Sequence, residues 1–346
     1  MTIKEELILG FIGTYTKKNS RGIYKFLLDL SSGKIRKLNL AYAIDNPTYL
    51  AIDRDRNILY SSCKIDDKAG VSSFKFWKEK DSLDLINQCL FEEKQPCHIS
   101  VSSEKQVLIS SNYHENKMIV YNTLEGIILE SKNIGEHSSN NITPHIHCSV
   151  FTNDEKYIIS LDLGLDKMII YTFEDNILSK KDDLSYTFPK GTGPRQIASL
   201  TSKSIYYVLS ELTSEVFVFK YDPSSNTIFE NIQTINSLPN NLNIDKSGAA
   251  IKIHPNNNFL YTSDRGSNTI SLFHIDQANG NLKYIDNFSC MGICPRDFQI
   301  DPSGKFLISA NELSDDISIF SINQVTGNLN YIYSEKVPTP ICIEFI

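Results

Sequence analysis

Two sets of positions recur along the chain, with a constant number of residues between matching members of the two sets. Together these positions hold the side chains best suited to catalysis. The first set comprises Thr48, Cys97, His147, Arg195, Ala249, Arg296 and Ile341. The second set lies sixteen positions further along and comprises Lys64, Tyr113, Leu163, Glu211, Arg265 and Glu312. Histidine exchanges protons near neutral pH, and arginine binds carboxylate or phosphate through paired N–H donors. These residue types predict proton transfer and charge stabilisation on a small anionic substrate.

The first set marks the start of an apolar segment that occurs seven times, at intervals of 45 to 54 residues. After each of the first six copies, a turn leads to a second apolar run, such as Ile58–Tyr60. A third run, such as Met118–Tyr121, and a fourth short run, as in Thr326–Ile332, complete the unit. The seven copies are Pro47–Ile52, Pro96–Val101, Ile146–Phe151, Pro194–Ala198, Gly248–Ile253, Pro295–Ile300 and Pro340–Phe345.

Four short strands in a unit of about 50 residues are typical of a β-propeller blade. One such sheet cannot bury both of its faces alone, so the blades must stack around an axis. Seven copies predict an all-β fold, a seven-bladed β-propeller of four-stranded antiparallel blades, as a single domain over residues 1–346. A pair of β-sandwiches or an α/β fold would require unequal repeats or a helical period, and the sequence shows neither.

The two ends of the chain are expected to close the ring. The chain begins with a second-strand pattern, Leu7–Tyr15, and ends with a first-strand pattern, Ile341–Ile346. Pairing of the N-terminal and C-terminal strands would complete the seventh blade and remove the open edges of the ring. Residues 337–346 are therefore predicted to be essential for stability.

Both sets of positions are expected at one mouth of the central channel. The first strand of a blade lines the axis and the second runs antiparallel to it, so the start of one lies beside the end of the other. Scaffold positions repeat Ile, Leu, Val and Phe, whereas the mouth positions differ between blades. Solvated salt bridges at the channel mouth, Arg195–Glu211 and Arg296–Glu312, would explain part of this variation between blades. Three arginines with His147 exceed what pairing needs and favour a pocket for an anion.

The composition limits the classes of partner. The chain has 34 Lys and Arg against 41 Asp and Glu, a formal net charge of −7, so nucleic acid and membrane surfaces are not expected as partners. Its seven cysteines include no C-x-x-C pair, as is typical of reduced thiols in a cytoplasmic protein. The apolar run Leu7–Ile12 is too short for a signal sequence or a membrane span. A soluble cytoplasmic monomer or weak homodimer is expected.

A series of short motifs resembles one known family in both order and spacing. They are Gly13–Thr16, Arg21–Tyr24, Pro144–His147, Asp162–Asp166, Gly191–Arg195, Leu260–Gly266, Pro295–Phe298, Ile300–Lys305 and Ala310–Asn311. Through them nearly the whole chain resembles the lactonase family of seven-bladed propellers. This family is typified by bacterial propeller-type 6-phosphogluconolactonases, and fungal carboxymuconate cyclases are its relatives.

The resemblance implies hydrolysis of a sugar lactone, above all 6-phosphogluconolactone of the pentose phosphate pathway. No cofactor is expected, and no metal, since the sequence has no C-x-x-C pair of the kind that binds zinc. The sequence departs from the usual family pattern at Gln196, Asp264 and Glu312, where the family commonly has His, Asn and Gln, respectively. These departures affect the identity of the substrate more than the fold. The catalytic group that the family implies falls on His147, Arg195, Glu211 and Arg265.

The residue types suggest a role for each member of the site. His147 or Glu211 is the candidate general base, and a lowered pKa of a glutamate beside Arg195 favours His147. Arg195 or Arg265 would stabilise the oxyanion that forms on the carbonyl. The residues expected to bind the substrate, including its phosphate or carboxylate, are His145, Arg296, Glu312, Lys64 and Tyr113.

Three other functions are compatible with a propeller. A cycloisomerase acting on a carboxylated muconate would use the same His, Arg and Glu set. A metal-dependent lactonase would need several inward-facing carboxylate or Asn ligands, which a cationic mouth disfavours. A non-catalytic interaction propeller of the WD40 type would repeat Gly-His and Trp-Asp dipeptides, and this chain has a single Trp. A fold by itself does not establish an activity.

The remaining histidines and turns are expected to be structural. His98, His254 and His274 fall within strand patterns that lack a converging partner, and His114 and His137 are expected in solvated loops. Asp162 and Asp166 are expected to form a turn around Gly164 through side-chain bonds to the backbone. The charged segment Lys78–Asp81 is expected at a solvated hairpin tip.

Overall fold

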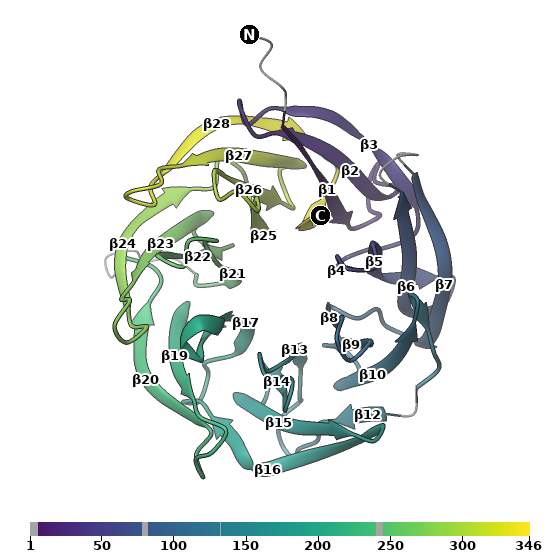
Figure 1. Cartoon of the computed structure of the whole chain (residues 1–346), viewed down its shortest axis with the longest axis vertical. Coiled ribbons are helices and arrows are strands. Elements are labelled where there is room, and N and C mark those ends of the chain that lie inside the picture. Colours follow the sequence, from purple (N-terminus) through teal and green to yellow (C-terminus); the bar gives the residue numbers. More distant parts are fainter. Residues whose placement is uncertain (1–5, 78–81, 132, 240–244) are drawn as a thin grey trace.

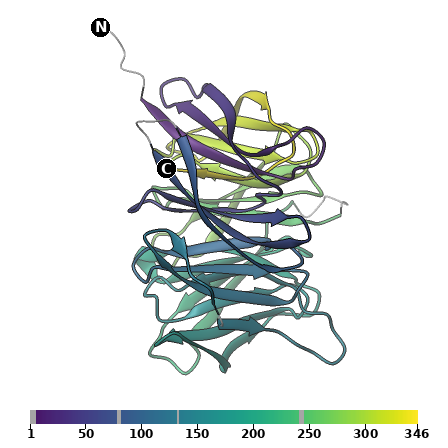
Figure 2. The same cartoon turned by 90° about the vertical axis from the view of Figure 1, so that its right-hand side faces the viewer.

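The computed structural model describes residues 6–77, 82–131, 133–239 and 245–346. In these residues the chain forms seven antiparallel sheets that stand side by side in a ring (Figure 1). Viewed from the side, the strands of successive blades cross the molecule in stacked layers (Figure 2). The prediction of an all-β, seven-bladed propeller is confirmed. We interpret this ring as a single domain that comprises residues 1–346.

Blades 1 to 3 follow one another along the chain from residue 50 to residue 187. Blade 1 consists of β4 (Leu50–Asp53), β5 (Ile58–Ile65), β6 (Lys68–Trp77) and β7 (Ser82–Glu92). Blade 2 consists of β8 (His98–Ser102), β9 (Val107–Asn112), β10 (Lys117–Leu124), β11 (Ile127–Ile128) and β12 (Asn133–Glu136). Blade 3 consists of β13 (Ile146–Phe151), β14 (Ile158–Asp162), β15 (Lys167–Glu174) and β16 (Ile177–Thr187).

The last four blades include the one that joins both ends of the chain. Blade 4 consists of β17 (Pro194–Leu200), β18 (Ile205–Ser210), β19 (Glu215–Tyr221) and β20 (Phe229–Asn236). Blade 5 consists of β21 (Gly248–Ile253), β22 (Phe259–Asp264), β23 (Thr269–Ile275) and β24 (Leu282–Ser289). Blade 6 consists of β25 (Pro295–Ile300), β26 (Phe306–Asn311), β27 (Asp316–Ile322) and β28 (Leu329–Lys336). Blade 7 consists of β29 (Pro340–Phe345), β1 (Leu7–Thr14), β2 (Gly22–Asp29) and β3 (Ile35–Ala43).

The hydrophobic core lies between blades rather than within one of them. The middle strands are buried on both faces, as in β18, where all six residues are buried. Each of the seven apolar clusters joins two neighbouring blades. Between blades 3 and 4, for example, the rings of Tyr186 and Phe219 meet edge to face at 4.9 Å. A blade therefore depends on its neighbours for burial, which is why the ring has to close.

The predicted closure of the ring is confirmed. The C-terminal strand β29 pairs antiparallel with the N-terminal strand β1, so that Ile343 lies opposite Ile12 and Phe345 opposite Gly10. Outside the ladder, the Ile346 N–H donates to the Leu9 carbonyl at 3.0 Å. Ile12 and Ile343 are both fully buried in the core that blade 7 shares with blade 6. The two ends of the chain thus complete one blade and its interface.

Blade 2 differs from the predicted four-strand unit. Glu125 and Gly126, with φ angles of 50° and 88°, form the tight turn that leads from β10 into β11. The hydroxyl of Ser131 then donates to the Val120 carbonyl of β10, where an unbroken fourth strand would pair its backbone. Further along, β12 resumes the pairing with β10. The outer edge of this blade is therefore made of two short strands.

Helical structure in the described ranges is limited to one 3-10 turn, Thr201–Lys203. None of the helices found there is long and apolar enough to cross a membrane. The charged segment Lys78–Asp81, expected at a hairpin tip, lies outside the described residues.

Removing residues 337–346 should prevent the chain from folding, because β1 and two inter-blade cores would lose their partner. We expect no cooperative thermal transition, measured by circular dichroism. An unchanged melting temperature would contradict the closure.

A single substitution tests the same interface in a chain that still folds. Ile343→Ala should lower the free energy of unfolding by about 2–5 kcal/mol, the usual effect of a large-to-small change in a core. Urea denaturation measures this change. Val325→Ala is the matched control, since Val325 is 87% exposed and its truncation should leave stability unchanged.

Candidate active site

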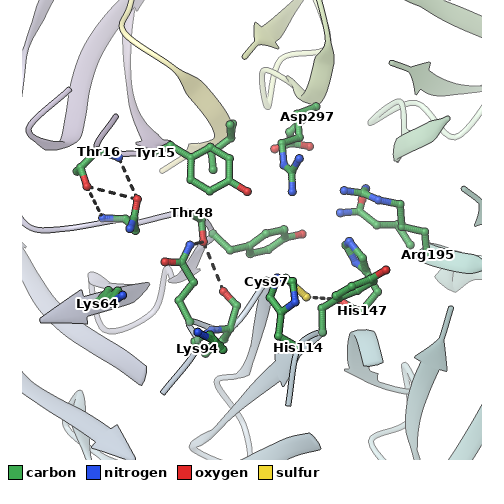
Figure 3. Close-up of a pocket in the computed structure, with 18 of the residues that line it drawn as sticks. Tyr15, Thr16, Thr48, Lys64, Lys94, Cys97, His114, His147, Arg195 and Asp297 are labelled. Atoms are coloured by element: carbon green, nitrogen blue, oxygen red, sulfur yellow. Dashed lines mark hydrogen bonds between the residues drawn. The ribbon is translucent and has the colours of Figure 1, made fainter. Parts of the chain in front are cut away.

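A cavity of about 510 Å³ opens at one end of the ring axis, within the size range of small-molecule sites. Its wall includes members of both recurring sets, and Figure 3 shows Arg195 and His147 across the cavity from Tyr15. The expectation that the two sets meet at one mouth agrees with this geometry. Seven of the nine predicted site residues line the cavity, namely Lys64, Tyr113, His147, Arg195, Glu211, Arg265 and Arg296.

The first strands of blades 3 to 7 each have a β-bulge at the first-set residue, and in blades 3, 4, 6 and 7 this residue lines the cavity. The pairing between the first and second strands skips one position at His147, Arg195, Arg296 and Ile341, and two at Ala249 and Ala250. A bulge leaves its extra residue out of the ladder and turns the side chain away from the alternating pattern. The bulge explains how a residue at the start of a first strand comes to face the cavity.

In every blade except blade 1, where Cys63 stands at this position, the residue directly before the second-set residue is polar and its side chain is hydrogen-bonded. In blade 3, Asp162 Oδ1 accepts from the N–H groups of His145 and Leu165 at 2.8 and 2.9 Å. In blade 5, Asp264 accepts from the N–H groups of Ser247 and Ser267 at 2.9 and 2.8 Å. Such side chains tie two adjoining loops together where the strand ends. The residues at the same position in four other blades also form side-chain hydrogen bonds. They are Thr14, Asn112, Ser210 and Asn311.

One carboxylate joins two of the arginines. Glu211 Oε2 lies 2.8 Å from Arg195 Nε and 3.0 Å from Arg265 Nη2. Arg195 is only 3% exposed, and its Nη1 also donates to the Ala249 carbonyl. Burial and the nearby Arg265 lower the pKa of Arg195 to about 10. Burial alone would raise the pKa of Glu211, but the two arginines outweigh it and lower that pKa, so Glu211 is ionised.

The third arginine has a carboxylate of its own. Arg296 Nη1 lies 3.3 Å from Glu312 Oε2, and its guanidinium lies 5.4 Å from the centre of the Tyr15 ring. Glu312 does not line the cavity. Its carboxylate contacts Arg296 from outside the cavity lining, and substrate binding by Glu312 stays a prediction.

His147 stands in a buried and strongly cationic environment. It is 5% exposed, and its Nδ1 has no hydrogen-bond partner among the described residues. Burial, and next the positive charges of Arg195 and Arg296, hold the pKa of His147 well below its usual range. The imidazole is therefore neutral at pH 7, in the form that accepts a proton.

His145 lies behind the cavity wall rather than in it. Its ring stacks on Tyr113 at 4.1 Å with an interplanar angle of 3°, and its Nδ1 donates to the Tyr113 carbonyl at 3.0 Å. Tyr113 in turn meets the His147 ring edge to face at 6.2 Å. His145 therefore orients Tyr113, which lines the cavity and packs against His147.

The expectation that His137 is solvated is wrong. Its side chain is fully buried, and Nδ1 lies 2.6 Å from Asp162 Oδ2. Asp162 uses its other oxygen for the turn around Gly164, in agreement with its predicted structural role. The isolated sequence position of His137 gave no sign of this partner, which lies 25 residues away. His254 is structural as expected, with Nε2 2.8 Å from the Gly304 carbonyl.

The most informative cavity residue that the alignment of the internal repeats missed is Tyr15. It directly follows Thr14, the last residue of β1, as Tyr113 follows Asn112 and Glu211 follows Ser210. It is the blade 7 member of the second set. Counting sixteen positions beyond Ile341 runs past the end of the chain, whereas joining the two ends first would have found it. Other cavity residues missed are Thr16, Lys17, Asn46, Lys94, Gln95, His114 and Asp297.

Within the described ranges, no three His, Cys, Asp or Glu side chains come together in a way that could hold a metal ion. Independence from metals and cofactors stays a prediction.

Comparison with known proteins places the chain in one family. The sequence model of the family described as "Lactonase, 7-bladed beta-propeller" matches residues 9–345. The chain therefore belongs to the lactonase family of seven-bladed β-propellers, as the sequence motifs implied.

Individual relatives agree with this assignment. The chain is 33% identical over 297 residues to the 6-phosphogluconolactonase of Bacillus subtilis, and the match covers 84% of each protein. A crystal structure of a protein from Lactobacillus plantarum superposes with a TM-score of 0.92 at 28% identity, over 99% of this chain and 100% of that one. The periplasmic gluconolactonase of Pseudomonas aeruginosa has the same fold, with a TM-score of 0.92 at 24% identity over 99% of both chains.

Replacing the shared carboxylate should destabilise the fold. Glu211→Gln leaves Arg195 and Arg265 without their common counter-charge, and breaking a largely buried ion pair destabilises by about 3 kcal/mol. Urea denaturation at pH 7 measures the change. Glu230→Gln, on an exposed position of β20, is the matched control. Equal stability of the two variants would show that the ion pair contributes nothing.

The protonation of His147 can be followed directly by NMR of histidine-labelled protein. The His147 signal is the one absent from His147→Gln. We expect it to remain in the neutral form as the pH falls well below 6.5, because a lowered pKa delays protonation. Arg296→Gln removes one of the charges responsible and should shift the titration to higher pH. A wild-type midpoint at or above 6.5 would contradict the assigned environment.

Proposed function

We propose that this protein hydrolyses 6-phosphogluconolactone to 6-phosphogluconate in the cavity at the channel mouth. The observation that carries the proposal is the convergence of neutral His147 with Arg195 and Arg265, which are bridged by Glu211. Support comes from membership of the lactonase family and from the Bacillus subtilis relative, whose name states this activity.

The arginines supply the electrostatic part of the reaction. Attack of water on the lactone carbonyl turns its oxygen into an oxyanion, and positioned cationic donors stabilise that charge. Arg195 is held by Glu211 and by the Ala249 carbonyl, so its guanidinium is fixed before the substrate arrives. Arg265 shares Glu211 and faces the same cavity. Fixed donors need no reorganisation during the reaction, which is the source of their effect.

His147 supplies the proton transfers. The neutral imidazole takes a proton from the attacking water as the new C–O bond forms. When the tetrahedral intermediate collapses, the bond between the carbonyl carbon and the ring oxygen breaks, and the imidazolium returns the proton to that oxygen. The immediate product is an open-chain carboxylic acid with a free hydroxyl, to which one water molecule has been added. The acid then releases its remaining proton to solvent and leaves as the carboxylate. The surrounding arginines make the imidazolium a strong acid, which favours the second transfer.

Glu211 is assigned a positioning role. Both arginines contact the same oxygen of its carboxylate, and they lower its pKa, so that it is a poor proton acceptor. Of the two candidate bases that the sequence left open, we therefore assign His147.

A cytoplasmic role in the pentose phosphate pathway is part of this proposal. It rests on the activity named for the Bacillus subtilis relative and on the seven cysteines, all of which are free thiols in the structure. Free thiols are typical of a reducing compartment.

Substitution of the two central residues tests the reaction. His147→Ala and Arg195→Ala should each reduce kcat/KM for freshly prepared 6-phosphogluconolactone at least ~100-fold, the lower end of a general acid–base contribution. Acid release above the spontaneous rate is followed at constant pH. His274→Ala, on the exposed side of β23, serves as the control. Full activity in both site variants, with melting temperatures like that of the wild type, would refute the assignment.

A further inference from the structure

Three lysines line the cavity on the side away from the catalytic group. Lys17 follows β1 in blade 7, Lys64 lies in β5 of blade 1, and Lys94 precedes β8 of blade 2. In Figure 3, Lys64 and Lys94 lie on the opposite side of the cavity from Arg195. This group, Lys17, Lys64 and Lys94, is called the lysine arc below.

The lysine arc differs from the arginines in its pairing. Arg195 and Arg265 share Glu211, and Arg296 pairs with Glu312. No ion pair with a carboxylate is found for any arc lysine in the described part of the chain. Glu93, next to Lys94, also lines the cavity, so three positive charges face one negative charge on this side. The arc therefore holds positive charge that the protein itself leaves unneutralised.

The backbone beneath the arc is held in place. The Lys94 N–H donates to Glu115 Oε1 at 2.6 Å, and its carbonyl accepts from Asn112 Nδ2 at 2.6 Å. The Lys64 N–H donates to the Asp45 carbonyl at 2.9 Å. These bonds fix where each side chain starts, although the lysine side chains keep their own freedom.

Tyr15 connects the arc to the arginines. The Lys17 ammonium lies 4.3 Å from the centre of its ring, and the Arg296 guanidinium lies 5.4 Å from the same ring. The loop that carries Tyr15 is tied to the segment that connects blade 7 to blade 1, because the Thr16 N–H donates to Asn46 Oδ1 at 3.1 Å. The ring thus draws two cations together at the border between the two halves of the cavity.

We propose that the lysine arc binds the phosphoryl group of the substrate and makes the site selective for phosphorylated lactones. This inference rests on the proposed function. A phosphate monoester carries a charge of about −1.5 to −2 near pH 7, and three ammonium groups without carboxylate partners can take it up without breaking an existing ion pair. The arginines would first have to leave Glu211 or Glu312. With the phosphoryl group on the arc, the lactone ring extends toward His147 and Arg195.

The test compares two lactones that differ in the phosphoryl group, 6-phosphogluconolactone and glucono-δ-lactone. In the triple variant K17M/K64M/K94M, kcat/KM for the phosphorylated lactone should fall at least ~100-fold, because three contacts to a charged group are lost. The value for glucono-δ-lactone should stay within about twofold, since that substrate makes none of these contacts. The control K18M/K37M/K68M removes the same charge from exposed lysines that do not line the cavity, and both values should stay unchanged.

An equal loss with both lactones, or no loss with either, would overturn the assignment of the arc while leaving the lactonase proposal intact. If the wild type accelerates neither reaction, the proposed function fails, and calorimetric binding of 6-phosphogluconate and gluconate decides about the arc. Binding of 6-phosphogluconate that is lost in the arc variant, retained in the control and absent for gluconate supports a phosphoryl site. Equal or absent binding of the two sugar acids in the wild type overturns it.

Discussion

The pairing of β29 with β1 is the constraint on which the rest of the molecule depends. No blade can bury its two faces alone, so each of the seven cores needs two neighbouring blades. The two cores on either side of blade 7 are complete only when the ends of the chain meet. The same pairing also completes the site. It brings Tyr15, from the N-terminal part of the chain, over Arg296, near the C-terminus. Stability and the shape of the cavity therefore depend on one ladder of backbone hydrogen bonds.

The formal charge of −7 conceals a cationic cavity. Three arginines in one small space repel one another, and burial removes the water that would screen them. Glu211 offsets most of this repulsion because it forms ion pairs with two arginines at once, and Glu312 forms an ion pair with the third. The carboxylates neutralise enough charge for the fold to tolerate the arginines, and they also fix the guanidinium groups in place. Structural and functional demands are thus met by the same contacts.

The sequence predicted the ring, its closure and most of the mouth, because apolar periodicity and a repeat of about 50 residues can be read directly from the chain. It located the two sets of positions without showing how their side chains reach the cavity. Bulges such as the one at His147 depend on how two strands pair, which no single segment reveals. Contacts between distant segments were also missed. Tyr15 was lost because the blade it belongs to is split between the ends, and the partner of His137 lies in another strand, at Asp162. Unpaired lysines such as Lys94 look like any solvated residue until the structure places them around a cavity.

A strongly lowered pKa does not exclude His147 as a base, because the charge of the substrate changes the balance between its neutral and protonated forms. In the free protein, burial and uncompensated arginine charge disfavour the imidazolium. A bound phosphoryl group and the oxyanion of the intermediate both bring negative charge into the same cavity, and each favours the protonated form of His147. In the proposed reaction, His147 therefore becomes a stronger base as the oxyanion forms, and it becomes a weaker base when the oxyanion is lost, at the step where the proton has to leave. A permanently ionised carboxylate beside His147 would hold the proton too long, which is a reason for Glu211 to contact the arginines instead.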